Sequence, residues 1–327
     1  MDTLIRFLFD QYRVRGQIVR IDAAWAQVAR RHQQHEGRDL APTVRDRLGE
    51  LSSAGLLLAA SLKFDGALVM QIQGAGPVAL FVVECESGGS FRATLKLRPG
   101  ATVPHDASLA DMVNRNDAGR FAVTLVPDKA SGRERAQVAS GQGGARASIT
   151  SPYQGIVPFE GDTVAEVLER YMIRSEQIPT RLWLAANDQT AFGLLLQRMP
   201  DDGGTGPDSD GTGVDPDGWQ RVITLADTLT RAEMLALPVE TILKRLFWEC
   251  PMTALDRRQP TFACSCSREK VGAMLQMLGR DEIESILAER GDVTVTCEFC
   301  NTDYRFDAVD GFRLFAGIQP AGPAARQ

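Results

Sequence analysis

Four of the six cysteines lie in two tight pairs in the last quarter of the chain, Cys264-Ser265-Cys266 and Cys297-Glu298-Phe299-Cys300. Four sulfurs at these spacings can converge on one tetrahedral Zn²⁺ at roughly 2.3 Å each. No histidine follows His105, so we expect an all-thiolate ligand set. A closed four-cysteine site has no open position for water, which argues against zinc-dependent hydrolysis.

Such a site has two interpretations, and the spacing alone leaves both open. Most four-cysteine sites are structural staples. Thiolates are also the nucleophilic form of cysteine, and neighbouring cysteines can close into disulfides when an oxidant reaches them. Zinc binding contributes about 10–16 kcal/mol to the folding of small sites. Since whole domains are stable by roughly 5–15 kcal/mol, loss of the metal is predicted to unfold a lobe as small as 262–315.

The residues around the cysteines predict two helices and a hairpin. Ser267 can cap a helix that ends at Gly279, and Asp281 with Glu284 resembles the capping box of a second helix that ends at Gly291. The segments 293–296 and 304–306 are predicted strands on either side of the second cysteine pair. The apolar residues expected to face the core of this lobe are Val271, Leu275, Leu278, Ile283, Ile286 and Leu287.

Composition narrows the class of protein. The 327 residues carry a net charge of -6, which makes a nucleic-acid partner improbable because phosphate binding needs a basic face. The first residues, Met1-Asp2-Thr3-Leu4-Ile5-Arg6, do not form a signal peptide, and no apolar run is long enough to span a bilayer. Paired cysteines without a secretory signal indicate the reducing cytoplasm, where thiolates bind metal instead of forming disulfides.

The N-terminal part of the chain is predicted to be an α+β domain. A strong helical pattern covers 43–62, and strand-like runs at 67–73, 78–84 and 91–98 predict an antiparallel sheet. Another helix is expected over 163–172. Cys85 lies between two glutamates, which disfavour its thiolate, so we interpret it as inert. No Ser/His/Asp or Cys/His arrangement is evident, and the sequence therefore predicts a protein that is not an enzyme.

An acidic stretch and an amphipathic helix connect this domain to the cysteine lobe. Residues 200–218 are rich in Asp, Gly and Pro and are predicted to be disordered. Thr230 and Glu233 then form a predicted capping box. A stripe of apolar residues follows, which we expect to pack on a core in the resting protein and to become exposed if the cysteine lobe melts. The stripe comprises Val239, Ile242, Leu243, Leu246 and Phe247.

Several sequence blocks resemble the 33 kDa heat-shock protein family of redox-regulated holdase chaperones, and they occur in the order typical of that family. In the cysteine lobe the blocks are Cys264-Ser265-Cys266-Ser267-Arg268-Glu269 and Cys297-Glu298-Phe299-Cys300. In the rest of the chain they are Ser61-Leu62-Lys63-Phe64-Asp65-Gly66, Gln73-Gly74-Ala75-Gly76-Pro77, Tyr153-Gln154-Gly155 and Ser175-Glu176-Gln177-Ile178-Pro179-Thr180.

The resemblance implies an α+β fold with an N-terminal antiparallel sheet and packed helices (1–199), a helical linker preceded by the acidic insert (200–260), a small zinc-binding redox-switch domain (261–316) and a flexible tail (317–327). It implies that Cys264, Cys266, Cys297 and Cys300 bind one Zn²⁺ in the reduced, inactive state. Oxidation would then form the disulfides Cys264–Cys266 and Cys297–Cys300, release the metal and unfold the linker.

The resemblance also implies the partners. The oxidised protein, often a homodimer, would bind unfolding client proteins without ATP, and neither nucleic acid nor membrane would be a partner. Residues 127–151 and 200–218 look like insertions relative to the family pattern. Cys250 has no place in the four-ligand set and is expected to be a bystander, with a mixed disulfide to one of the four cysteines as the alternative.

Two other functions remain open at this point. One is a zinc-lobe module that does not switch and binds RNA or ribosomes, because four-cysteine knuckles are common there. The other is a thiol oxidoreductase that uses Cys297 and Cys300, because a C-x-x-C pair also serves disulfide exchange. The acidic charge balance disfavours the first, and a pair held on zinc disfavours the second.

Overall fold

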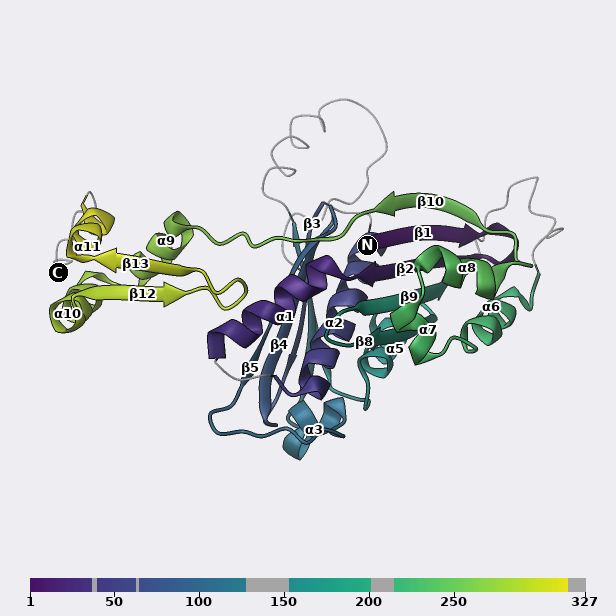
Figure 1. Cartoon of the computed structure of the whole chain (residues 1–327), viewed down its shortest axis with the longest axis horizontal. Helices are drawn as coiled ribbons and strands as arrows, with labels where there is room; N and C mark the ends of the chain where they lie inside the picture. The colour runs from purple at the N-terminus through teal and green to yellow at the C-terminus, as the bar shows by residue number, and fades with distance from the viewer. Residues whose placement is uncertain (37–39, 63–64, 128–152, 201–214, 317–327) are drawn as a thin grey trace, which may run out of the picture. The chain divides into compact units, whose positions relative to one another are not determined.

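The computed structural model of the chain describes residues 1–36, 40–62, 65–127, 153–200 and 215–316 (Figure 1). The chain divides into two compact units, Met1–Ala263 and Cys264–Gln327. The segment 127–151, which looks like an insertion relative to the family pattern, lies outside the described residues after Pro127. Most of the acidic stretch, 201–214, also lies outside them.

Two sheets form the frame of the first unit. Sheet A has the strand order β10-β1-β2-β9-β8, with all neighbours antiparallel. Sheet B has the order β11-β5-β4-β3-β6-β7, antiparallel except for the β11–β5 pair. The strands of sheet A are β1 (Thr3–Phe9), β2 (Val14–Ile21), β8 (Thr180–Ala186), β9 (Ala191–Arg198) and β10 (Thr253–Arg258). Those of sheet B are β3 (Gly66–Gln73), β4 (Val78–Glu86), β5 (Ser90–Leu97), β6 (Arg120–Pro127), β7 (Tyr153–Pro158) and β11 (Thr261–Phe262).

Helix α2 (Pro42–Ser61) is the centre of the larger apolar core, because it contacts strands of both sheets. It is therefore buried almost all round, and even Ser52 and Ser53 are inaccessible. A helix that is buried on nearly every side is typical of a position between two layers. Helices α1 (Ala23–Glu36), α3 (Leu109–Val113) and α5 (Val164–Ser175) complete this part of the unit.

Three short helices of the linker cover the face of sheet A that lies opposite α2 (Figure 1). They are α6 (Gly218–Ala226), α7 (Arg231–Ala236) and α8 (Val239–Phe247). The predicted capping box is confirmed, since Thr230 and Glu233 exchange hydrogen bonds at the start of α7. The chain then returns to sheet A as β10 and reaches the edge of sheet B as β11, immediately before the first cysteine pair.

The second unit is small and has its own core. Ser267 caps α9 as predicted, and Gly279 and Gly291 end α9 and α10 with positive φ. The elements are α9 (Arg268–Leu278), α10 (Arg280–Arg290), the β12–β13 hairpin (Asp292–Thr296 and Asp303–Asp307) and α11 (Ala308–Phe315). The fully buried residues of its apolar cluster are Val271, Leu275, Ile283, Val293, Phe306 and Phe315.

The structure corrects three sequence-based expectations. No capping box forms at Asp281, because α10 begins directly after Gly279 and leaves no extended residue there to act as a cap. Leu278 is 58% exposed because it lies off the buried face of α9. The predicted disorder of 200–218 does not extend to its last residues, since the Asp215 amide donates to Gln11 and Gly218 begins α6. In addition, the strands β1, β7, β10 and β11 were not expected.

Candidate metal centre and redox site

Two local structures position the four cysteines. Cys264 and Cys266 lie in the extended segment between β11 and α9, and Ser267 fixes the start of the helix by accepting a hydrogen bond from the Lys270 amide. Cys297 and Cys300 lie in the turn between β12 and β13. The Cys297 amide donates to the Thr302 carbonyl at 3.0 Å, and the Asn301 amide donates to the Cys297 carbonyl at 2.8 Å, which closes the turn.

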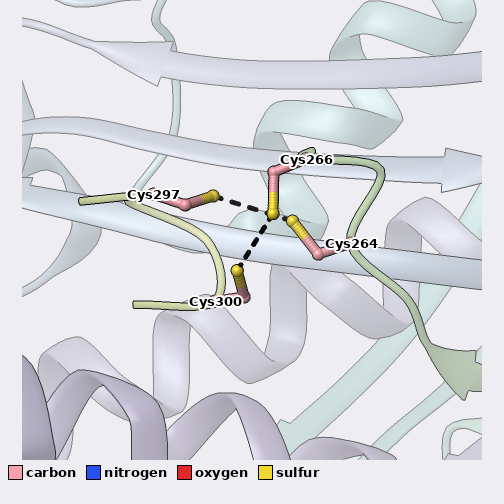
Figure 2. A group of neighbouring side chains, drawn as sticks. All are labelled: Cys264, Cys266, Cys297 and Cys300. Atoms are coloured by element: carbon pink, nitrogen blue, oxygen red, sulfur yellow. Dashed lines mark hydrogen bonds between the residues drawn. The ribbon is translucent and has the colours of Figure 1, made fainter. Parts of the chain in front are cut away.

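The structure brings all four sulfurs together (Figure 2). The four Sγ atoms lie within 4.8 Å of one another, and none of the four is part of a disulfide. Cys264 Sγ is 3.7 Å from Cys297 Sγ, and Cys266 Sγ is 3.3 Å from Cys300 Sγ. Sulfurs at the corners of a tetrahedron with a metal–sulfur distance of about 2.3 Å are roughly 3.8 Å apart. The cluster therefore fits one tetrahedral metal ion with four thiolate ligands.

Two hydroxyl groups of the hairpin lie beside the sulfurs. Tyr304 Oη donates to Cys266 Sγ at 3.1 Å, and Thr302 Oγ1 is 3.2 Å from Cys300 Sγ. Sequence reasoning assigned Tyr304 only to a strand and did not single out Thr302. No local pattern could have indicated these contacts, because they depend on how the hairpin folds back over the first cysteine pair.

The surroundings move the pKa values of the sulfurs in different directions. Burial, opposed by the Tyr304 hydrogen bond, raises the pKa of Cys266 to about 12 in the absence of a metal. Burial also raises the pKa of Cys297, although backbone amides of the turn oppose it. At Cys300 burial acts in the same direction but is outweighed by hydrogen bonds from Thr302 and the neighbouring thiols, which lower the pKa to about 7. Cys300 is thus the sulfur that ionises most readily among these three.

The arrangement can do two kinds of chemistry. Four converging thiolates can hold a metal ion, and such ligands suit soft or borderline metals. Each of the four residues is also only half-buried, so a small oxidant can reach the sulfurs. Since all four lie within 4.8 Å, contact distance does not select one pairing of disulfides over another.

The other two cysteines are buried in the first unit. Cys85 lies on β4 in the core, and burial, followed by the charge of Glu84, raises the pKa of its thiol well above the ordinary range. Cys250 belongs to the linker, just beyond the end of α8, and its burial in the apolar cluster on sheet A again raises the pKa of the thiol. Both are poor nucleophiles in the resting fold.

The predicted linker stripe is buried in the resting structure. Its five residues belong to one cluster with apolar side chains of sheet A. Phe247 makes an edge-to-face contact with Phe9, with ring centroids 5.0 Å apart, and a tilted contact with Phe7 at 6.3 Å. The members of the stripe are Val239, Ile242, Leu243, Leu246 and Phe247.

Comparison with known proteins identifies the family to which this chain belongs. The family model described as Hsp33 protein matches residues 2–307. The chain belongs to the Hsp33 family. Curated relatives include a protein named 33 kDa chaperonin from Methylobacillus flagellatus, 44% identical over 96% of this chain and 94% of the relative. A second 33 kDa chaperonin, from Chromobacterium violaceum, is 40% identical over the same shares of the two chains.

A solved Hsp33 structure shares the fold. The crystal structure of the 33 kDa chaperonin from Thermotoga maritima superposes with a TM-score of 0.74 and covers 96% of this chain and 98% of its own. Its sequence is 20% identical to this one, so the likeness concerns the fold alone. Among the described helices of this Hsp33 family member, none is both long and apolar enough to cross a membrane.

Proposed function

We propose that this Hsp33 family member is a redox-regulated, ATP-independent holdase chaperone and not an enzyme. The observation that carries the proposal is the cluster of four cysteine sulfurs within 4.8 Å of one another, in a small unit that follows directly on the linker. The names of the relatives, 33 kDa chaperonin, support the chaperone activity. We further propose that the protein acts in the cytoplasm, and that neither nucleic acid nor membrane is its partner.

In the reduced state, Cys264, Cys266, Cys297 and Cys300 hold one Zn²⁺. A bound ion would keep these four residues as thiolates, and through them the start of α9 would be connected to the β12–β13 turn. Among the described residues of this unit, six buried apolar residues form the core, which is a small core for a unit of this length. The metal cross-link therefore provides a large share of the stability of the folded unit.

Oxidation removes the ligands in pairs. Two thiolates and two protons react with one molecule of hydrogen peroxide: one disulfide forms, the O–O bond breaks, and two molecules of water leave. We propose the pairs Cys264–Cys266 and Cys297–Cys300, as the family resemblance implies. Once the sulfurs are bonded to each other, the ligand set is lost, and the unit unfolds with the loss of its metal.

The linker connects this event to the binding of clients. We propose that the chain works in three parts, the core at 1–199, the acidic insert with the helical linker at 200–260 and the redox-switch domain at 261–316, followed by the tail at 317–327. Unfolding of the third part releases the second, which uncovers the apolar stripe of α8 and the face of sheet A beneath it. Unfolding proteins then bind the exposed apolar surface, with the oxidised chaperone acting as a homodimer.

The test combines metal content with client protection. Purified protein is reduced, loaded with zinc and exposed to hydrogen peroxide at mild heat, and zinc release is followed with a colorimetric chelator. Aggregation of thermally unfolding citrate synthase is measured by light scattering before and after oxidation. We expect release of one zinc per chain together with a gain in aggregation suppression. Retained zinc without such a gain would overturn the proposal, and peptide mapping by mass spectrometry identifies the disulfide pairs.

A further inference from the structure

The edge of sheet A is formed by a strand that belongs to the linker. β10 pairs antiparallel with β1, and it lies between α8 and the first cysteine pair in the sequence. On its other side β1 pairs with β2 along its whole length, from Thr3 opposite Arg20 to Phe9 opposite Val14. If β10 detaches, β1 therefore stays in the sheet and its outward N–H and C=O groups lose their partners.

β10 buries little of its own side-chain surface. Its side chains are mostly exposed, and Leu255 is a bulged residue between the pairs Arg6–Asp256 and Phe7–Ala254. Arg257 forms an ion pair with Glu240 of α8 at 2.7 Å, with both side chains at least half exposed. Ion pairs of this kind contribute little stability. Part-buried polar contacts add to this, with Arg6 3.3 Å from Asp256 and Arg258 donating to the Ser87 carbonyl at 2.6 Å. β10 is thus held by main-chain hydrogen bonds to β1, by these polar contacts and by its connection to α8, and release of the linker removes that connection.

The side chains of β10 match the strand beneath it poorly. Ile5 and Phe7 of β1 point to the apolar face that the linker covers, and their partners across the pair are Arg257 and Ala254. A charged residue opposite Ile5 and a methyl group opposite Phe7 make weak cross-strand pairs. A segment with branched or aromatic side chains at these positions would bury more apolar surface than β10 does.

We propose that β1 is a strand acceptor for clients: after the linker is released, an extended client segment of about six residues pairs with the β1 edge in place of β10. This inference rests on the proposed function and names the chemistry of its partner. The partner is an unfolded polypeptide with apolar side chains at alternate positions. Main-chain hydrogen bonds make the edge tolerant of client sequence, and the apolar face beside Ile5 and Phe7 favours β-prone segments. In the resting protein, β10 occupies the edge as a weak internal competitor.

Amide hydrogen exchange of the full chain tests this proposal in three states. In the reduced protein, we expect protected amides in both β1 and β10. After oxidation without client, the outward amides of β1 and all amides of β10 should exchange rapidly, while β2 stays protected. After addition of a carboxymethylated, permanently unfolded test protein, protection should return to β1 alone. Rapid exchange of the β1 edge in the client complex would overturn the proposal, as would a β10 that stays protected after oxidation.

Two further outcomes are distinguishable. Joint return of protection to β1 and β10 in an oxidised dimer without client would show that β10 of a second copy takes the edge, which contradicts the proposal. Failure of the oxidised protein to release zinc or to suppress aggregation would contradict the proposed function itself, whatever the exchange of β1. The two failures therefore give different results in the same preparation.

A variant in which β10 pairs more strongly with β1 provides a second, independent test. The double variant Ala254→Val with Arg257→Val improves both cross-strand pairs and should compete with clients roughly tenfold better. We expect zinc release at the wild-type rate and an affinity for the unfolded test protein about tenfold weaker. Leu255→Val is the matched control, since this bulged residue has no partner on β1 and its replacement should leave affinity unchanged. Equal affinity of the double variant and the wild type would contradict the proposal.

Discussion

Tyr304 donates a hydrogen bond from its hydroxyl to Cys266 Sγ over 3.1 Å. Hydrogen bonds to charged groups stabilise them by about 1.5–3 kcal/mol, and a metal-bound thiolate that accepts one is a weaker nucleophile. We predict that Tyr304→Phe, which removes only the hydroxyl, speeds peroxide-driven zinc release about fivefold. The rate is measured with a colorimetric chelator. Tyr153→Phe, on β7 of the first unit, is the control, and an unchanged rate in Tyr304→Phe would show that the hydroxyl does not protect the sulfur.

Removal of the metal from the reduced protein should unfold the second unit and leave the core of the first unit folded. Its buried core consists of six apolar residues, and a structural zinc contributes about 10–16 kcal/mol to the folding of such sites. Treatment with a chelator and a reductant should therefore collapse the dispersed NMR signals of 264–316 and leave those of sheet B in place. Zinc should restore the lost signals. A dispersed spectrum of this unit in metal-free protein would contradict the prediction.

Truncation of Phe247 should release the linker without oxidation. The side chain is 3% exposed and packs on Phe7 and Phe9, so Phe247→Ala is expected to cost about 3–5 kcal/mol. We predict client binding by the reduced, zinc-loaded variant and faster alkylation of Cys250, which follows α8 in the linker and is buried in the same apolar cluster as Phe247. Trp248→Ala is the matched control because the adjacent Trp248 is 75% exposed. A variant that is inactive until oxidised would show that this contact does not hold the linker.

Glu50 should make the first unit less stable as the pH rises. Burial raises the pKa of this carboxyl more than the ion pairs with Arg47 and Arg231 lower it. The folded state then binds a proton more tightly than the unfolded state, so stability is greatest below the ordinary pKa of about 4.3 and falls as pH rises toward the raised pKa in the folded protein.

The matching variant is Glu50→Gln, which keeps the shape and removes the charge. We predict a higher melting temperature than the wild type at pH 8 and a difference that shrinks at pH 5. Glu284→Gln, on the exposed surface of α10, serves as the control. A larger advantage of Glu50→Gln at pH 5 than at pH 8 would contradict the sign of this effect.

The sequence determined those features that depend on neighbouring residues. The spacing of the cysteines predicted a four-sulfur cluster, and the structure places the four sulfurs within 4.8 Å. Ser267, Gly279 and the Thr230–Glu233 capping box marked the ends of helices, because capping is a contact between residues three or four positions apart. The apolar stripe of α8 was visible for the same reason, since one helix face repeats every three to four residues.

Only the tertiary structure decided the long-range pairings. β10 reads Thr-Ala-Leu-Asp-Arg-Arg, which has little strand character, and it becomes a strand because β1 offers it a free edge from the far end of the sequence. The contact of Tyr304 with Cys266 likewise depends on the path of the hairpin over the first cysteine pair. Such contacts have no local period, since their energy comes from partners that the chain brings together only when it folds.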